Sequence, residues 1–455
     1  MYTRLCSSVL FPLHELYKGH ASTQLRAELE RSQWLKPTEL LRLQAQRLQQ
    51  FLVEAGKNVP YYREVFASQG FNPERVESVA HLAALPFLTK SLVRENVEAL
   101  KSKTAGPLRR YNTGGSSGEP LVFYMGRGRI SHDVAAKWRA TRWWNVDIGD
   151  AEIVLWGSPV ELGSQDRIKN LRDRVFRSHL LPAFEMSDAR MDEFLASIRR
   201  IRPRMMFGYA SALAMLVTHA QARGVVLNDL GVRVVFTTGE TLYPDQRKII
   251  EAAFGAPAAN GYGARDAGFI AHQCPAGSLH LSTEHIVVEL VNADGVAVAP
   301  GEEGEIVVTH LATGDFPFIR YRTGDVAVQS LEPCSCGRGL PVLKSVLGRS
   351  TDFIRTRSGN AMHALALIYE VRDDPGVRAF KYIQAEDLSI ELQIVAGPEL
   401  TLAKEQEIFA KLTRRLGADT PLKIVRVERI AAEKSGKYRY VVSKATAAPA
   451  RSLSD

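Results

Sequence analysis

Short apolar runs alternate with amphipathic segments between residues 150 and 255. Runs of strand length lie at 152–157, 204–209 and 232–240, and segments with helical spacing lie at 191–201, 211–224 and 244–255. This alternation is typical of a parallel sheet that is covered by helices. Binding sites in such sheets lie at the carboxyl ends of the strands. Two polar segments fall there, FGYAS at 207–211 and TTGET at 237–241.

The pattern differs on either side of this region. Residues 22–56 are rich in Leu, Gln, Arg and Glu at helical spacing, and Gly56 is a suitable helix stop. From 279 to 330 the apolar positions alternate with period two around Asn292–Gly295, which predicts an antiparallel hairpin. Beyond residue 349, an alternating strand, a charged helix and a second strand follow one another.

These patterns predict an α/β protein of two domains. The large N-terminal domain, residues 1–348, combines βαβ-type sheets covered by helices with an antiparallel β subdomain. The small C-terminal α+β domain, residues 349–445, is expected to move relative to the large one. Residues 446–455 are expected to form a disordered tail. The length of 455 residues allows two or three domains, and the helical N-terminal region offers a surface for a homodimer.

Composition and charge exclude several classes of protein. Hydrophobic residues make up 45% and charged residues 24%, which excludes collagen-like and wholly disordered chains. Uncharged apolar windows of about 18 residues do not occur, so we expect a cytoplasmic protein without an integral membrane segment. The net charge of +8 and the pI near 9.2 come from basic residues spread along the chain, so we expect no nucleic-acid partner.

A glycine-rich segment, YNTGGSSGEP at 111–120, predicts a phosphate-binding loop. Its glycines let backbone N–H groups turn inward to form an anion nest, and Thr113, Ser116 and Ser117 add hydroxyl donors. It is not a Walker loop, because no Gly-Lys-Ser/Thr sequence follows. A polar hairpin without a ligand is the alternative interpretation.

Two further segments carry residues that suit a nucleotide. Tyr262, beside Gly263 in NGYGARD, offers a ring face to a planar base. Asp325, at the end of YRTGD, offers a carboxylate to a pair of ribose hydroxyls. Each segment alone is weak evidence, and a lone Thr-Gly-Asp is more often a surface turn.

Taken in order, YNTGGSSGEP, TTGET, YGARD, YRTGD, GRSTD and SGKYR resemble the adenylate-forming superfamily of acyl- and aryl-CoA synthetases. The segment CSCGRGLPVL is similar to its phenylacetate–CoA ligase and CapK branch. The resemblance implies ATP-dependent activation of a small-molecule carboxylate and acyl transfer to coenzyme A. Transfer to an amine or hydroxyl in polysaccharide or cell-surface biosynthesis is the alternative. A non-catalytic scaffold is the third.

The resemblance also implies roles for individual residues. Residues expected to hold the ATP phosphates are Thr113, Gly114, Gly115, Ser116, Ser117 and Gly118. Residues expected around the adenosine are Gly239, Glu240, Thr241, Tyr262, Gly263, Asp325 and Arg349. Lys437, in SGKYR, would reach the carboxylate and the α-phosphate, where a cation stabilises the transition state and Mg²⁺ neutralises the leaving pyrophosphate. Asp352 would lie at the interdomain hinge.

One position departs from the family pattern. The glutamate that ends the Tyr-Gly-x-x-Glu motif and contacts Mg²⁺ is Asp266 in this chain. Aspartate keeps the carboxylate but is one methylene shorter, and Mg²⁺ demands ligand distances of about 2.0–2.1 Å. A tolerated exchange is the simpler interpretation, and slower adenylation is the other.

Three of the four cysteines and two histidines lie in two segments that the antiparallel region could bring together. Cys274, His280, Cys334 and Cys336 would form a closed Cys₃His site suited to structural Zn²⁺. His272 is the second choice for the nitrogen ligand, because it lies two residues from Cys274. Buried reduced thiols are the alternative to a metal site.

The pocket for the acyl group is expected at three strand ends. Its walls would come from 207–211, from the segment before 237–241 and from 262–269. Arg265 would pair with a second anionic group on the substrate or form a salt bridge at the rim. The neighbouring Trp143 and Trp144 are expected to pack in the core and not to line this pocket.

Overall fold

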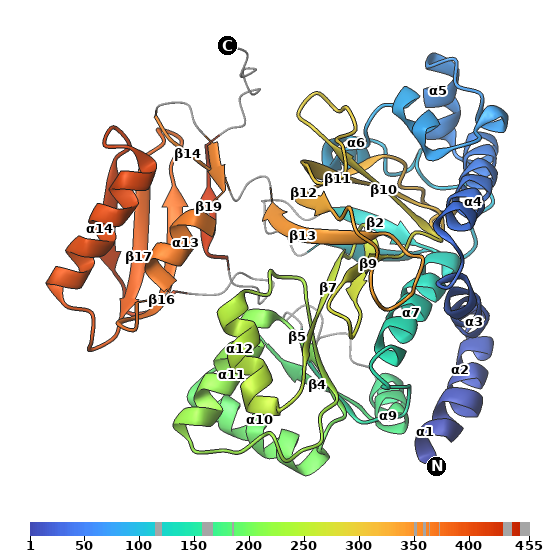
Figure 1. Ribbon diagram of the computed structural model, residues 1–455. Coiled ribbons are helices and arrows are strands. Elements are labelled where there is room, and N and C mark those ends of the chain that lie inside the picture. Colours follow the sequence, from blue (N-terminus) through green and yellow to red (C-terminus); the bar gives the residue numbers. More distant parts are fainter. Residues whose placement is uncertain are drawn as a thin grey trace. The chain divides into compact units, whose positions relative to one another are not determined.

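Figure 1 shows the chain as a computed structural model. The structure describes residues 1–455 except 114–120, 157–166, 184–185, 350–352, 358–360, 364, 373, 431–438 and 446–455. The chain divides into two compact units. Among the described residues, the larger comprises 1–323 and 327–347, and the smaller comprises 324–326, 348–430 and 439–445.

Within the described residues, the large unit is built around a mixed sheet of 11 strands in the order β10-β11-β12-β13-β9-β8-β7-β6-β5-β3-β4. The strands are β3 (Glu152–Trp156), β4 (Ser178–Pro182), β5 (Met205–Gly208), β6 (Val234–Thr238), β7 (Ala258–Ala264), β8 (Gly268–Gln273), β9 (Leu279–Leu281), β10 (Ile286–Val291), β11 (Glu303–His310), β12 (Tyr321–Gln329) and β13 (Val342–Arg349). Strands β4-β3-β5-β6-β7 pair in parallel, and β7-β8-β9-β13 pair antiparallel. The predicted antiparallel region therefore continues the parallel sheet.

Successive side chains of the parallel strands pack on opposite faces of the sheet. The helices on these faces are α7 (Arg127–Arg142), α10 (Asp188–Ile201), α11 (Ala210–Ala222) and α12 (Pro244–Phe254). Met206 and Val235 join the core beneath α10, α11 and α12, whereas Met205 and Val234 pack with Ala140 of α7. The predicted α/β class is confirmed. The sequence patterns missed β4 and the charged helix before it, α9 (Arg167–Phe176).

The N-terminal region is helical, as predicted, but its boundaries differ. The helices are α1 (Tyr2–Leu5), α2 (Phe11–Tyr17), α3 (Ser22–Ser32), α4 (Pro37–Asn58), α5 (Pro60–Ser68) and α6 (Lys90–Glu95). The predicted stop at Gly56 is wrong, because α4 continues to Asn58 and ends before the extended Val59, which precedes Pro60. Gly56 instead permits close packing, since a Cβ there would lie 3.0 Å from the Phe66 ring.

A buried ion pair joins α7 to the loop before β10. The Arg139 guanidinium donates to Glu284 Oε1 at 2.6 Å, and both side chains are at most 1% exposed. Ser32 of α3 donates to the same carboxylate oxygen at 2.9 Å. The pair therefore connects three segments that are distant in the sequence.

Replacing Arg139 with Leu should lower the free energy of unfolding by about 3–5 kcal/mol, because it leaves the Glu284 carboxylate buried without its cation. Urea denaturation measures this loss. The double variant Arg139→Leu, Glu284→Leu should recover part of this stability, since neither charge of the pair then remains buried. A single variant as stable as the wild type would contradict the expectation.

The small unit contains a four-stranded sheet in the order β18-β17-β16-β19 and a separate hairpin. Its elements are β14 (Phe353–Arg355), β15 (Ala361–His363), α13 (Leu365–Arg372), β16 (Val377–Gln384), β17 (Ile390–Ala396), α14 (Leu402–Leu416), β18 (Leu422–Arg426) and β19 (Val441–Ser443). Helix α14 begins at Thr401, whose side chain accepts a bond from Lys404 N, and it buries Ile408, Leu412 and Leu416. This spacing gives one apolar face.

In the part of the chain that the structure describes, helices long and apolar enough to cross a bilayer are absent.

Candidate active site

The stem of the glycine-rich loop is a short hairpin. Strand β1 (Arg109–Asn112) pairs antiparallel with β2 (Val122–Met125). Beyond the strands, Thr113 N donates to Leu121 O and Thr113 Oγ1 accepts from Leu121 N, both at 3.0 Å. Thr113 therefore closes the base of the loop. Gly114, Gly115, Ser116, Ser117 and Gly118 lie outside the described residues.

The YGARD segment forms the tight turn between β7 and β8. Its Gly263 admits no side chain, because a Cβ there would lie 2.3 Å from the carbonyl oxygen of Gly268. At the end of the turn, Asp266 is 6% exposed and its Oδ2 accepts from the Tyr321 hydroxyl at 2.5 Å. Since Tyr321 opens YRTGD, this bond joins two of the predicted motifs.

The same turn is also joined to the stem of the glycine-rich loop. Arg265 Nη1 donates to the Asn112 carbonyl oxygen at 3.2 Å. This contact with Asn112 differs from both roles expected of Arg265, the pairing with a substrate anion and the salt bridge at the rim. Arg265 thus fixes the loop stem against the turn that carries Asp266.

The sequence motifs do not include Arg129 of α7, which hydrogen bonds the backbone of the YGARD turn. Its guanidinium donates to the carbonyl oxygens of Arg265 and Asp266 at 3.2 and 3.4 Å, and its Nε donates to Asp133 at 2.9 Å. Burial opposes ionisation of Asp133, but Arg129 and His132 hold the pKa of that carboxyl below its ordinary value. Arg129 belongs to no motif, so only the contacts reveal its role.

The two polar strand ends contact each other as the parallel sheet predicts. TTGET begins at the end of β6, where Gly239 adopts a φ of +79°. The Glu240 Oε2 atom accepts from Ser211 N, in the first turn of α11, at 3.0 Å. Glu240 therefore joins TTGET to FGYAS. Thr241 follows this turn and is partly buried.

The remaining predicted nucleotide contacts are placed only in part. Tyr262 lies on β7 and Asp325 on β12, and both are partly buried. Arg349 ends β13, but its side chain lies outside the described part of the structure. Lys437 and Asp352 also lie outside the described residues, as does the predicted tail at 446–455.

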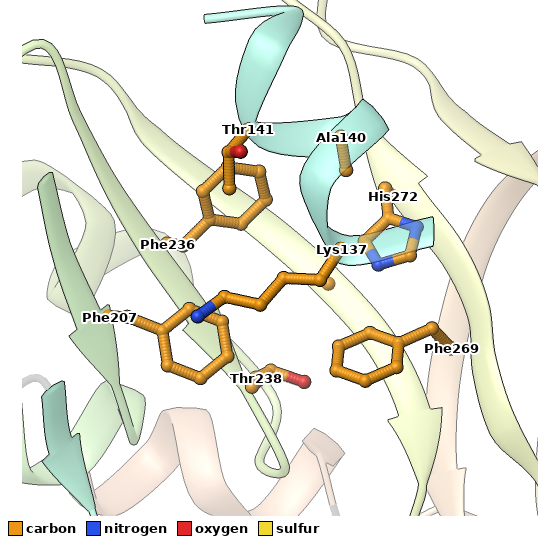
Figure 2. Close-up of a pocket in the computed structure, with 9 residues that line it drawn as sticks. Lys137, Ala140, Thr141, Phe207, Phe236, Thr238, Phe269 and His272 are labelled. Atoms are coloured by element: carbon orange, nitrogen blue, oxygen red, sulfur yellow. The ribbon is translucent and has the colours of Figure 1, made fainter. Parts of the chain in front are cut away.

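A small pocket lies between α7 and the sheet, next to the YGARD and TTGET segments (Figure 2). Its lining residues are Lys137, Ala140, Thr141, Phe207, Phe236, Thr238, Gly261, Phe269 and His272. They include Phe207 of FGYAS, Phe236 just before TTGET and Phe269, from the three segments that the sequence analysis singled out. The Trp143 and Trp144 side chains are not among them, and Trp143 is buried beside the cysteines.

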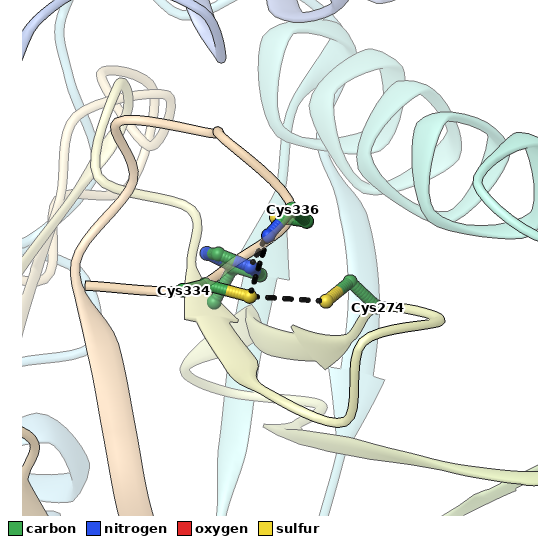
Figure 3. A group of neighbouring side chains, drawn as sticks. Cys274, Cys334 and Cys336 are labelled. Atoms are coloured by element: carbon green, nitrogen blue, oxygen red, sulfur yellow. Dashed lines mark hydrogen bonds between the residues drawn. The ribbon is translucent and has the colours of Figure 1, made fainter. Parts of the chain in front are cut away.

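Three cysteines, drawn in Figure 3, and His280 converge beside Trp143, the residue that follows α7. The ligand atoms of Cys274, His280, Cys334 and Cys336 all lie within 4.8 Å of one another. Cys274 Sγ is 3.6 Å from Cys334 Sγ, and His280 Nε2 is 3.3 Å from Cys336 Sγ. These separations suit a tetrahedral cation with bonds of about 2.0–2.3 Å.

The surroundings of this cluster also fit a metal ion. His280 Nδ1 lies 3.2 Å from the Leu340 carbonyl oxygen, which fixes the ring and leaves Nε2 facing the sulfurs. Burial raises the pKa of the Cys274 thiol to about 11, so a bound cation would be needed to hold this sulfur as the thiolate. The loop that carries Cys334 and Cys336 passes close to the chain before α4, since a Cβ at Gly339 would lie 1.9 Å from Leu35 O. His272 is not part of the cluster.

Comparison with known proteins identifies the family. A model described as AMP-binding enzyme matches residues 176–313, and one described as CapK C-terminal domain matches 354–444. Protein CapK of Staphylococcus aureus is 23% identical over 416 residues, 89% of each chain. Phenylacetate-coenzyme A ligase of Escherichia coli is 27% identical over 333 residues, 71% of this chain and 74% of that one. The chain belongs to the adenylate-forming superfamily. Its branch is that of the phenylacetate–CoA ligases and CapK.

Solved structures show the fold of this superfamily. A 2-hydroxyisobutyryl-CoA ligase in the postadenylation state has a TM-score of 0.75, with 19% identity over 91% of this chain and 92% of that one. The O-succinylbenzoate coenzyme A synthetase of Bacillus subtilis, in complex with AMP, has a TM-score of 0.52, with 18% identity over 72% and 67%. The motifs that meet around Asp266 therefore lie in a fold that this chain shares with these ligases.

Proposed function

We propose that this protein activates a carboxylic acid with ATP, releases pyrophosphate and transfers the acyl group from the adenylate to coenzyme A. The observation that carries the proposal is the YGARD turn, which is joined to the stem of the glycine-rich loop by Arg265 and to YRTGD by Tyr321. These two contacts support the proposal because they join segments whose residue types suit phosphates and a ribose.

In this proposal each motif has one task. Thr113 and the loop that follows it bind the ATP phosphates, while TTGET and Tyr262 surround the base and Asp325 binds the ribose. Arg349 approaches the ribose and the phosphate. Lys437 neutralises charge as the carboxylate attacks the α-phosphorus.

Asp266 offers a carboxylate ligand for Mg²⁺, and the Tyr321 hydroxyl fixes its orientation. When bound, Mg²⁺ neutralises the phosphates and the leaving pyrophosphate.

A structural zinc ion is part of the proposal. Three thiolates and one imidazole form a complete tetrahedral ligand set, so no position remains for a substrate. The ligands join the end of β8, β9 and the loop between β12 and β13. We therefore assign this site to stability and not to the reaction.

A second candidate function keeps the adenylation but changes the acceptor. The match of residues 354–444 to the CapK C-terminal domain favours it. In this alternative an amine or hydroxyl, on a sugar or another precursor of a cell-surface polymer, displaces AMP in place of the thiol. A cytoplasmic location and a homodimer stay predictions of the sequence.

Pyrophosphate release from ATP and Mg²⁺, measured with aryl, fatty and amino-acid carboxylates, tests the proposal. We expect release that depends on one class of acid and rises severalfold with CoA, because the thiol clears the adenylate. Release that does not respond to CoA would favour the amine or hydroxyl acceptor. No release with any acid, although ATP still binds, would favour the non-catalytic scaffold, and Asp266→Glu would then test whether the shortened carboxylate is the cause.

A further inference from the structure

The first helical segment of the chain turns apolar side chains toward solvent. It comprises α1, the π-helix η1 (Cys6–Leu10) and α2, which follow one another without a break. Four apolar residues spaced by four, four and three positions share one face of this segment and are exposed: Leu5, Val9, Leu13 and Leu16. We call these four residues the apolar stripe. Leu16 is 73% exposed, whereas helices of globular proteins normally turn such a stripe to the core.

The inward face of the same segment is fixed by its own contacts. Phe11 is buried, and its ring packs against Trp138 of α7 and Phe176 of α9 at centroid distances of 5.1 and 5.3 Å (Figure 1). Glu15 is 4% exposed and accepts from the Ser22 hydroxyl at 2.5 Å. A carboxylate is therefore buried while leucines face water. These contacts hold the segment in one orientation, so the apolar stripe stays on its outer face.

Positive charge accompanies the apolar stripe. Burial and the neighbouring Arg172 and Arg109 guanidinium groups lower the pKa of Lys18, which ends the segment, so three cations lie close together. Asp173 already pairs with Arg172 at 2.5 Å, and Glu15 is buried. These two are the acidic residues of 1–20 and of α9, whose six basic residues are Arg4, Lys18, Arg167, Lys169, Arg172 and Arg174.

This combination fits a lipid bilayer better than a second copy of the chain. A dimer with twofold symmetry would place this face against itself. It would bring the same basic side chains together, and neither acidic residue of the two segments is available to balance them. Anionic lipid headgroups supply the missing negative charge, and the acyl region beneath them accepts the leucines.

We propose that residues 2–17 bind the surface of a bilayer that contains anionic lipids, with the apolar stripe inserted beneath the headgroups and the basic side chains among them. The segment lies in the plane of the bilayer and does not cross it, since about 20 apolar residues are needed to span the hydrocarbon core. This inference does not depend on the adenylation activity. It assigns a partner to a face that the proposed function does not use.

Sedimentation of the full-length protein with vesicles tests the inference. The vesicles contain phosphatidylcholine alone or phosphatidylcholine mixed with phosphatidylglycerol. We expect the affinity for the mixed vesicles to be at least about tenfold higher at low salt and to fall as NaCl is added, because salt screens the attraction. Equal affinity for the two kinds of vesicle, or no binding to either, overturns the proposal.

The double variant Leu13→Ser, Leu16→Ser tests the apolar stripe itself. It should weaken binding to the mixed vesicles by about tenfold or more, because less apolar area leaves water. The matched control is Leu331→Ser, Leu402→Ser, which removes two leucines that are 77% and 73% exposed outside the segment. Since all four leucines are exposed, both variants should keep the wild-type midpoint of thermal unfolding. Equal binding by the two double variants overturns the role of the stripe.

The oligomeric state distinguishes a bilayer from a second copy of the chain. Light scattering should give the same molar mass for the wild type and for Leu13→Ser, Leu16→Ser. A wild-type dimer that dissociates in this variant overturns the proposal and assigns the apolar stripe to contact between copies. All of these measurements are made without ATP, so a failure of the proposed adenylation leaves them unaffected.

Discussion

Lys437→Ala should reduce the rate of pyrophosphate release by about 10²–10³-fold, the loss that follows removal of one preorganised donor in other enzymes. The attacking carboxylate and the α-phosphate are both anionic, so the ammonium stabilises a transition state in which these charges meet. The effect should fall on kcat more than on the KM for the acid, because the interaction is strongest in the transition state.

Lys434→Ala is the matched control for this prediction. It removes the same charge three residues earlier in the segment that contains SGKYR. We expect Lys434→Ala to retain most of the activity. The loss expected in Lys437→Ala comes from one positioned ammonium group and not from a lower net charge of the segment. Equal losses in both variants would show that Lys437 has no specific role, and full activity of Lys437→Ala would refute its assignment.

Cys334→Ser should abolish binding of the proposed zinc ion and lower the midpoint of thermal unfolding by about 10 °C, if the site stabilises the large unit by ~3–5 kcal/mol. Cys334 lies in a core cluster with Trp143, Leu40 and Cys274. Without the ion, these buried thiols would lose the bonds that join the β8–β9 turn to the loop before β13.

Metal content per chain and calorimetry measure these effects together. The wild type should contain one zinc ion, and a strong chelator should reproduce the lower midpoint. Cys6→Ser is the control, because Cys6 is fully buried in the N-terminal helices and lies 3.6 Å from Val175 O, outside the cluster. A wild type without zinc, or a Cys334→Ser variant with full zinc content, would contradict a zinc site.

Much of the fold was predictable because its periodicities are local. The continuous apolar runs of β5 and β6 reflect two buried faces, and the apolar spacing in α10, α11 and α12 reflects the side of each helix that packs on the sheet. The helix stop predicted at Gly56 is wrong, because Gly56 serves packing and another residue ends the helix. Its missing Cβ serves the contact with Phe66, and the extended residue before Pro60 ends the helix.

The motifs predict which residues bind the nucleotide but not the contacts that hold the motifs together. The motifs name the residues whose side chains suit phosphates, a base and a ribose. They do not reveal Arg129, which binds two carbonyl oxygens of the YGARD turn from a helix more than 130 residues earlier. Nor do they reveal that Arg265 bonds Asn112 at the loop stem. Such contacts leave no pattern in a single sequence.

By itself the sequence determined the α/β class, the order of the adenylation motifs and the residue types for a thiolate site. Only the tertiary structure distinguished His280 from His272, although His272 is nearer to Cys274 in the sequence. Strand β9, which carries His280, pairs with β13, and the loop before β13 carries Cys334 and Cys336. Strand β8 lies one strand further away, at a spacing of about 4.8 Å. His272 therefore lies in the small pocket, because pairing between distant strands, not distance along the chain, decides which side chains meet.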